Sequence, residues 1–158
     1  MLRLTSQEKR RLDEVALRAV SQGVVITGAD RRIVSANNAF EAITGFSEKD
    51  LLGRNCAFMQ GPLTDPHSID MMRQSLNDGV EFSGEVQNYR KDGQTFWNEL
   101  TITPARDDKG LVTHFVGVCR DVTERVTAHE ALAETTRQLK SNCSPPMGRR
   151  LAGGLPRV

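Results

Sequence analysis

The sequence has no apolar run long enough to cross a membrane. Its longest apolar stretches, Gly23 to Thr27 and His114 to Cys119, are far shorter than the ~18 residues that a membrane helix needs. Charged residues begin at Arg3 and recur at Glu8 and Lys9, so they leave no room for a signal-peptide core at the N-terminus. We therefore expect a soluble protein that remains in the cytoplasm.

The sequence also has no large excess of charges of one sign. Twenty-one Lys and Arg residues stand against 20 Asp and Glu residues, which leaves a formal net charge of +1. This balance gives no reason to expect a nucleic acid or a membrane surface as partner. The length of 158 residues accommodates one domain with short appendages. We therefore expect no attached kinase, nuclease or DNA-binding domain.

Cysteines are few, with three at positions 56, 119 and 143. An odd number without a C-x-x-C pair fits neither a disulfide framework nor a zinc site, and it predicts free thiols in a reducing compartment. The glycine-rich phosphate loop, the nicotinamide fingerprint and the Gly-x-Ser-x-Gly motif are absent too. We therefore expect that the protein is not an enzyme.

The apolar periodicity predicts an α+β fold. Helical spacing of apolar residues indicates an amphipathic helix from about 6 to 21. Two short β-rich runs, 23–28 and 33–36, enclose a polar turn and predict a hairpin. Between 37 and 69, glycines and prolines break the pattern into short helices, and Pro66 begins a longer one.

The residues after this helix alternate with period two and predict three further strands. If Lys91, Asp92 and Gly93 form a three-residue loop with Gly93 in the left-handed conformation, the register of the two strands that the loop joins is fixed. Asn88 then faces Phe96, and Val86 faces Asn98. We thus expect a five-stranded antiparallel sheet with short helices on one face and flanking N- and C-terminal helices.

The last predicted strand, Leu111 to Asp121, carries apolar residues on both faces. The helical segment from Val122 to about Lys140 is the expected cover for its outer face, which carries Val112, Val116 and Val118. The division that we expect is an N-terminal helix over 1–21, a core domain over 22–124, a C-terminal helix over 125–141 and a disordered tail over 142–158.

Two asparagines stand on the apolar face of the predicted strands. Buried amides need hydrogen-bond partners, so Asn88 and Asn98 either satisfy each other or together bind one planar ligand. Gly84 and Gly117 leave room beside them. The pattern alone leaves both alternatives open.

A single cysteine lies in the region of short helices. Cys56 and Gln60 are four residues apart and face the same way in one helical turn. An isolated cysteine is most often a small buried hydrophobe. No histidine lies within five residues of Cys56, which argues against a Cys-His nucleophile.

Two motifs carry a family resemblance. The segments GRNCAFMQGP, from Gly53, and NYRKDGQTFWNEL, from Asn88, resemble the light-oxygen-voltage (LOV) domains, the flavin-binding blue-light receptors of the PAS superfamily. The resemblance covers about Gly23 to Glu124, and DVTER, from Asp121, resembles the hinge that leads from a PAS domain into an output helix. The first motif is specific because it places a cysteine at the centre of a helix that faces a flavin.

The resemblance implies an FMN that is bound without a covalent link in the dark. After blue light it implies a reversible bond from the Cys56 sulfur to flavin carbon C4a. The implied cofactor-binding residues are Asn88 and Asn98 at the pyrimidine edge, Asn55 and Gln60 at the ring and ribityl chain, Arg54 and Arg73 at the phosphate, and Thr27, Asn37, Phe82, Leu100, Phe115, Gly117 and Cys119 around the cavity. No metal is implied.

The first departure from the family is Ala57, because LOV domains usually have an arginine directly after the cysteine that grips the FMN phosphate. A charge-assisted hydrogen bond is worth ~1.5 to 3 kcal/mol, so its loss weakens FMN binding by about one to two powers of ten. We therefore expect partial flavin loading and better competition by riboflavin.

The second departure is Cys119, which stands where the family has a glutamine next to flavin N5 and O4. That glutamine is thought to reorient after the light reaction and to pass the event to the last strand. A thiol is a poor donor and has no amide to flip. We therefore expect a shifted flavin absorption and a weakened or rerouted signal.

The resulting interpretation is a short LOV photoreceptor that acts as a homodimer through its flanking helices on an unidentified downstream signalling protein. The main alternative is a PAS interaction or dimerisation module with weak or no flavin binding, which Ala57 and Cys119 favour. A flavoenzyme is a third class. The sequence contains no group of residues that would position the substrate of such an enzyme.

Overall fold

The computed structural model describes residues 5–19 and 21–143. The predicted tail lies outside these residues, apart from its first two positions. The elements follow one another as α1 (Ser6–Ala19), β1 (Gly23–Gly28), β2 (Ile33–Ala36), α2 (Asn38–Thr44), α3 (Glu48–Leu51), the 3₁₀ helix η1 (Cys56–Met59), α4 (Pro66–Asp78), β3 (Phe82–Tyr89), β4 (Thr95–Arg106), β5 (Val112–Asp121) and α5 (Thr123–Asn142). No helix within the described ranges is long and apolar enough to span a membrane.

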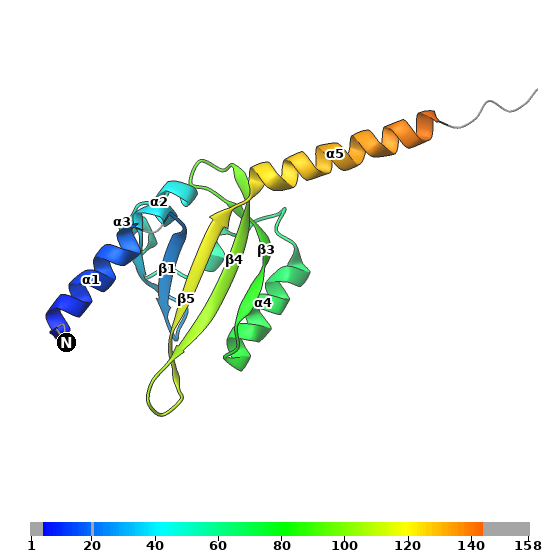
Figure 1. The fold of residues 1–158 in the computed structure, drawn as a ribbon. Helices are drawn as coiled ribbons and strands as arrows, with labels where there is room; N and C mark the ends of the chain where they lie inside the picture. Colours follow the sequence, from blue (N-terminus) through cyan, green and yellow to red (C-terminus); the bar gives the residue numbers. More distant parts are fainter. Residues whose placement is uncertain (1–4, 20, 144–158) are drawn as a thin grey trace, which may run out of the picture. The chain divides into compact units, whose positions relative to one another are not determined.

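The described chain divides into two units, one up to Glu124 and one from Arg125 onward. In the first unit, five strands form a single antiparallel sheet in the order β2-β1-β5-β4-β3 (Figure 1). This confirms the predicted α+β class and the five-stranded antiparallel sheet. The second unit consists of the main part of α5. That this helix covers Val112, Val116 and Val118 stays a prediction.

The register of the last three strands follows from the loop between β3 and β4. Gly93 adopts the left-handed conformation with φ of 85°, and the Gly93 N–H donates to the carbonyl oxygen of Arg90 over 3.0 Å. Asn88 consequently pairs with Phe96, and Val86 with Asn98, as the three-residue loop predicts. Both asparagines therefore lie on the buried face of the sheet, each at most 5% exposed.

Local sequence also sets the ends of α4. The Asp65 carboxylate accepts the N–H groups of His67 and Ser68, and Pro66 occupies the first turn, where a missing N–H costs nothing. Gly79, with φ of 64°, closes the helix in the left-handed conformation. The helix expected after Pro66 is thus present.

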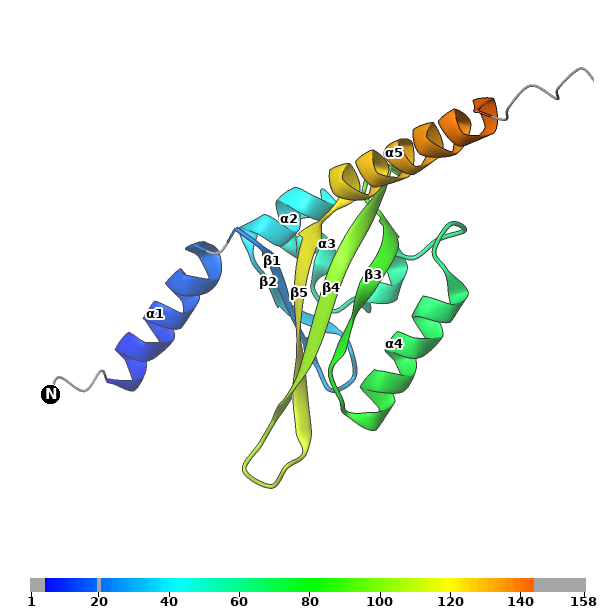
Figure 2. The same cartoon turned by 45° about the vertical axis from the view of Figure 1, so that its right-hand side comes forward.

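The helices of the first unit leave a space on one face of the sheet. Helix α4 packs beside β3, α3 packs against β2, and α2 packs against β1 and β5 (Figure 2). Their main hydrophobic cluster comprises Val25, Ile33, Phe40, Leu51, Met59 and Cys119. Because none of these residues comes from α4, the region between α4 and the sheet is not filled by this cluster.

Candidate functional site

A cavity of about 240 Å³ lies between the sheet and the helices α2, η1 and α4. Strands β1, β3, β4 and β5 each contribute side chains to its wall. The lining includes 11 of the 14 residues that the resemblance assigns to a cofactor: Thr27, Asn55, Cys56, Gln60, Arg73, Asn88, Asn98, Leu100, Phe115, Gly117 and Cys119.

Three of the assigned residues lie outside this lining and make other contacts. The Arg54 guanidinium stacks over the Phe58 ring at 3.8 Å. The Asn37 side chain caps α2 by accepting the Phe40 N–H, and it also accepts the N–H of Val24. The Phe82 ring is buried beside Gly84. The structure therefore gives Asn37 and Phe82 structural contacts and gives Arg54 a surface one.

The lining also contains residues that the sequence analysis did not assign to the site. A helical signal for part of this set was present, since Ile69, Met72 and Leu76 are spaced as one face of α4. Arg31, in the turn between β1 and β2, gave no comparable signal. The other unassigned lining residues are Val25, Phe40, Ala57, Met59 and Ile102.

The first thiol of the cavity belongs to Cys56, which begins the 3₁₀ helix η1. The Asn55 side chain caps this turn by accepting the Ala57 N–H over 3.0 Å, and Gln60 closes the turn through its own N–H. The turn is a 3₁₀ helix rather than the α-helical turn that the sequence favoured. Burial raises the pKa of the Cys56 thiol to about 11. Cys56 is therefore a neutral thiol at physiological pH.

The second thiol of the cavity comes from β5. Cys119 is 2% exposed, and burial raises the pKa of its thiol to about 12. Its strand partner is Leu100, so both residues point to the cavity side of the sheet. The cavity is therefore lined by two neutral thiols, one from η1 and one from the sheet.

The three cysteines are expected to differ strongly in reactivity toward an aromatic disulfide reagent. Cys143 is exposed, whereas Cys56 and Cys119 are shielded and protonated. A rise in pKa from 8.5 to about 11 lowers the thiolate fraction at pH 8 on the order of a hundredfold. The native protein should release one equivalent of the reagent's thiol rapidly, and the denatured protein three. Two rapid equivalents from native protein would contradict this, and Cys143→Ser is the control that removes the rapid phase.

The two asparagines of the cavity form a chain of hydrogen bonds with one open end. The Asn98 Nδ2 group donates to Asn88 Oδ1 over 3.1 Å, and the Asn88 Nδ2 group donates to the Met59 carbonyl oxygen over 3.4 Å. Asn98 Oδ1 is buried and has no hydrogen-bond partner among the described residues. An unpaired buried acceptor costs free energy. The site is therefore suited to a planar ligand that offers an N–H or O–H donor at this point.

One glycine gives the sheet side of the cavity its shape. A Cβ atom at Gly117 would lie 3.0 Å from Val25 Cγ1 and 3.8 Å from Leu100 Cδ1. Gly117 thus keeps this wall flat. Gly84, which the sequence paired with it in this role, is not part of the lining, and a Cβ atom there would lie 3.0 Å from the Phe82 ring.

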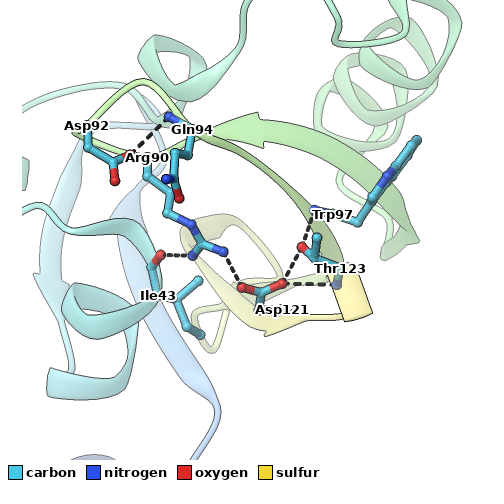
Figure 3. A network of polar contacts seen from close by, with 7 residues as sticks. All are labelled: Ile43, Arg90, Asp92, Gln94, Trp97, Asp121 and Thr123. Carbon is cyan, nitrogen blue, oxygen red and sulfur yellow. Dashed lines mark hydrogen bonds and ion pairs between the residues drawn. The ribbon is translucent and has the colours of Figure 1, made fainter. Parts of the chain in front are cut away.

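A polar network closes the end of β5, outside the cavity. Arg90 reaches from the end of β3 to the carbonyl oxygen of Ile43 and to the Asp121 carboxylate, which also accepts the N–H of Thr123 (Figure 3). The Thr123 hydroxyl in turn accepts the Trp97 N–H over 3.0 Å. Burial raises the pKa of Asp121, but hydrogen bonds from Thr123 and Arg90 outweigh it and hold the pKa below its usual range.

Comparison with known proteins places the chain among sensory domains. The PAS domain model matches residues 21–124. The chain is similar to Phototropin-1A of Oryza sativa subsp. japonica, with 43% identity over 112 residues, which cover 69% of this chain and 12% of the phototropin. It is also similar to the blue-light photoreceptor of Listeria monocytogenes serovar 1/2a, with 39% identity over 127 residues, which cover 78% of this chain and 49% of that protein.

A solved structure of similar size extends this comparison. The light-state structure of the LOV domain of the blue-light photoreceptor Aureochrome1 has 41% sequence identity and a TM-score of 0.65, and the match covers 76% of this chain and 96% of that one. The shared fold and sequence thus extend over nearly the whole of a known LOV domain. The chain belongs to the PAS family and, within it, to the LOV domains.

Proposed function

We propose that the chain is a blue-light photoreceptor that binds FMN in the cavity between η1 and the sheet. The observation that carries this proposal is the pairing of a neutral thiol, Cys56, with an unpaired amide oxygen, Asn98 Oδ1, in one cavity. The flavin supplies light absorption and an electrophilic carbon, C4a. Cys56 would supply the sulfur for a reversible bond to that carbon and, from its thiol, the proton for the adjacent flavin nitrogen N5.

Five further polar residues of the lining have a role in this proposal. Asn88 and Asn98 hydrogen-bond the pyrimidine edge of the ring, while Asn55 and Gln60 reach the ring and the ribityl chain. Arg73 faces the phosphate. The apolar lining from Leu100 and Phe115 excludes water from the ring. The same side chains hold the ring flat against Gly117.

The test is the visible absorption spectrum of the purified protein before and after a blue flash, with FMN added and removed. Reversible loss of the blue flavin band supports the photoreceptor. If no flavin binds even when supplied in excess, the alternative function, a PAS interaction or dimerisation module, replaces it. Ala57 favours that alternative, because it removes a cation from the lining and so favours partial loading and competition by riboflavin.

Signal output is proposed to run through the flanking helices of a homodimer to a downstream signalling protein. In α1, Leu12 and Val15 are 51% and 57% exposed, and in α5, Leu132 and Leu139 are 67% and 63% exposed. Apolar side chains at such spacing favour helix pairing with a second copy. Light would then bias the arrangement of the two copies.

Replacing the buried thiol of β5 should change both the spectrum and the signal. Cys119→Gln introduces an amide that can donate to flavin N5 or O4, which the weakly polar thiol cannot do well. We expect a shifted blue absorption band and a stronger light-dependent change in oligomeric state, measured by spectroscopy and by size-exclusion chromatography under illumination. An unchanged spectrum together with an unchanged light response would rule out this role for position 119.

A further inference from the structure

The charges around the cavity are all of one sign. Two arginines, Arg31 and Arg73, belong to its lining, and among the described residues the lining contains no aspartate or glutamate. A cavity wall with two positive charges and no acid attracts an anionic group on the ligand. The apolar and amide side chains at its other end suit an uncharged ring. The cavity therefore has a neutral end and a cationic end.

The two arginines differ in how far their charge is compensated. The Arg73 Nη1 group lies 3.2 Å from Asp70 Oδ1, in an exposed ion pair within α4. Arg31 donates from Nη2 to the side-chain oxygen of Asn77, a neutral partner. No ion pair of Arg31 with a carboxylate exists among the described residues. Of the two arginines in the lining, Arg31 is therefore the one whose positive charge is available to pair with an anionic group of a ligand.

Both guanidinium groups reach the same side of α4. Arg73 and Asn77 are four residues apart in this helix, so their side chains lie on one face, one turn apart. Because Arg31 is bonded to Asn77, its guanidinium contacts the turn of α4 that follows Arg73, while the Arg73 guanidinium reaches back to Asp70. Ala57 lines the same cavity and brings no charge to it. Two cations of the lining thus lie along one face of α4, which suits a ligand group with a double negative charge.

The backbone at Arg31 adds an independent observation. Arg31 has φ of 66° and is the one non-glycine residue with positive φ in the described chain. The turn is fixed by the Arg31 N–H, which donates to the Gly28 carbonyl oxygen, and by the Gly28 N–H, which donates to that of Arg32. Glycine would adopt this conformation without strain, whereas arginine does not. An arginine at this position therefore costs conformational free energy that a glycine would not.

We propose that Arg31 binds the phosphate of the flavin ligand together with Arg73, and that it selects FMN over riboflavin in a chain where Ala57 cannot. The contact comes from the turn between β1 and β2 instead of from the residue after the reactive cysteine. This inference rests on the proposed function, since it requires a flavin in the cavity. It makes Arg31 a specificity-determining residue.

The test compares two flavins that differ only in the phosphate. Flavin-free full-length protein is titrated with FMN and with riboflavin in phosphate-free buffer, and binding is followed by quenching of flavin fluorescence. Arg31→Gly should weaken FMN binding about tenfold or more, since it removes a charge-assisted hydrogen bond. Riboflavin affinity should stay within about twofold. The Tm of the flavin-free variant should equal or exceed that of the parent, because glycine relieves the strained turn.

The matched control is the neighbouring arginine. Arg32 lies outside the cavity lining and donates from Nη1 to the Gly53 carbonyl oxygen over 2.8 Å, so Arg32→Ala should leave both affinities near those of the parent. Adding Ala57→Arg to Arg31→Gly should restore FMN affinity without changing that of riboflavin.

The outcomes separate the two proposals. If Arg31→Gly changes neither affinity, weakens both flavins equally, or is matched by Arg32→Ala, the phosphate role of Arg31 is wrong while the flavin site stands. If the parent protein binds neither flavin, the proposed function itself fails. A selective loss of FMN affinity in Arg31→Gly alone establishes the role.

Discussion

Cys56→Ala is expected to keep the flavin and to lose the reversible, light-driven decrease of its blue absorption band completely. In the proposed reaction the thiol would supply the sulfur for the bond to C4a and the proton for N5, and alanine can supply neither. Alanine fills most of the same space at the start of η1, so the cap from Asn55 to the Ala57 N–H remains. Absorption spectra before and after a blue flash, at equal flavin loading, measure the effect.

The controls for this result are the other two cysteines. Cys119→Ala removes the second thiol of the cavity, and Cys143→Ala removes the exposed one. Both variants should retain the light-driven change. A Cys56→Ala protein that still loses its blue band reversibly would assign the chemistry to another group, with Cys119 as the first candidate because it lines the same cavity.

Asn98→Leu is expected to weaken the binding of FMN and riboflavin equally, by about tenfold to a hundredfold. The substitution removes the acceptor Asn98 Oδ1 and so leaves a polar group of the bound ring without a partner, which costs ~1–3 kcal/mol. The flavin-free protein should lose little stability. The substitution removes one unpaired buried acceptor, Asn98 Oδ1, and leaves another, Asn88 Oδ1, without its donor from Asn98. The two effects on the free energy of unfolding therefore oppose each other.

Fluorescence titration measures both affinities, and thermal unfolding of the flavin-free protein measures stability. The matched control is Glu99→Leu, since Glu99 follows Asn98 in β4 and points to the opposite face of the sheet. Glu99→Leu should leave flavin affinity unchanged. Undiminished affinity in Asn98→Leu would mean that the ring does not reach the amide. An FMN-selective loss would place the phosphate, rather than the ring, at this residue.

Strand register was predictable because it depends on few residues. The loop at 91–93 fixes the pairing of β3 with β4, and period-two alternation then assigns Asn88 and Asn98 to the buried face. The same kind of spacing rule applies to α4, where Ile69, Met72 and Leu76 recur at helical spacing and all line the cavity. The spacing of residues in the sequence is therefore enough to predict which side chains share a face when a short loop or a single helix determines their neighbours.

The rest of the site depends on contacts between distant segments. Period-two alternation assigns Phe82 to the buried face but does not say where along that face the helices leave a cavity, and Phe82 lies beyond its edge. Asn37 is an N-cap, a role that competes with ligand binding for the same side chain. Arg31 reaches the cavity through a left-handed turn and a bond to Asn77, 46 residues away. No periodicity encodes such a bond.

The network around Asp121 makes the boundary between Glu124 and Arg125 a suitable point for joining the first unit to another protein. Its members Arg90, Trp97 and Thr123 all precede Arg125, so these bonds close the end of the sheet with residues of the first unit alone. A foreign helix that follows Glu124 therefore replaces none of them. Recombinant fusions that exchange the segment after Glu124 therefore keep the end of β5 intact, so that the first unit can be joined to other proteins.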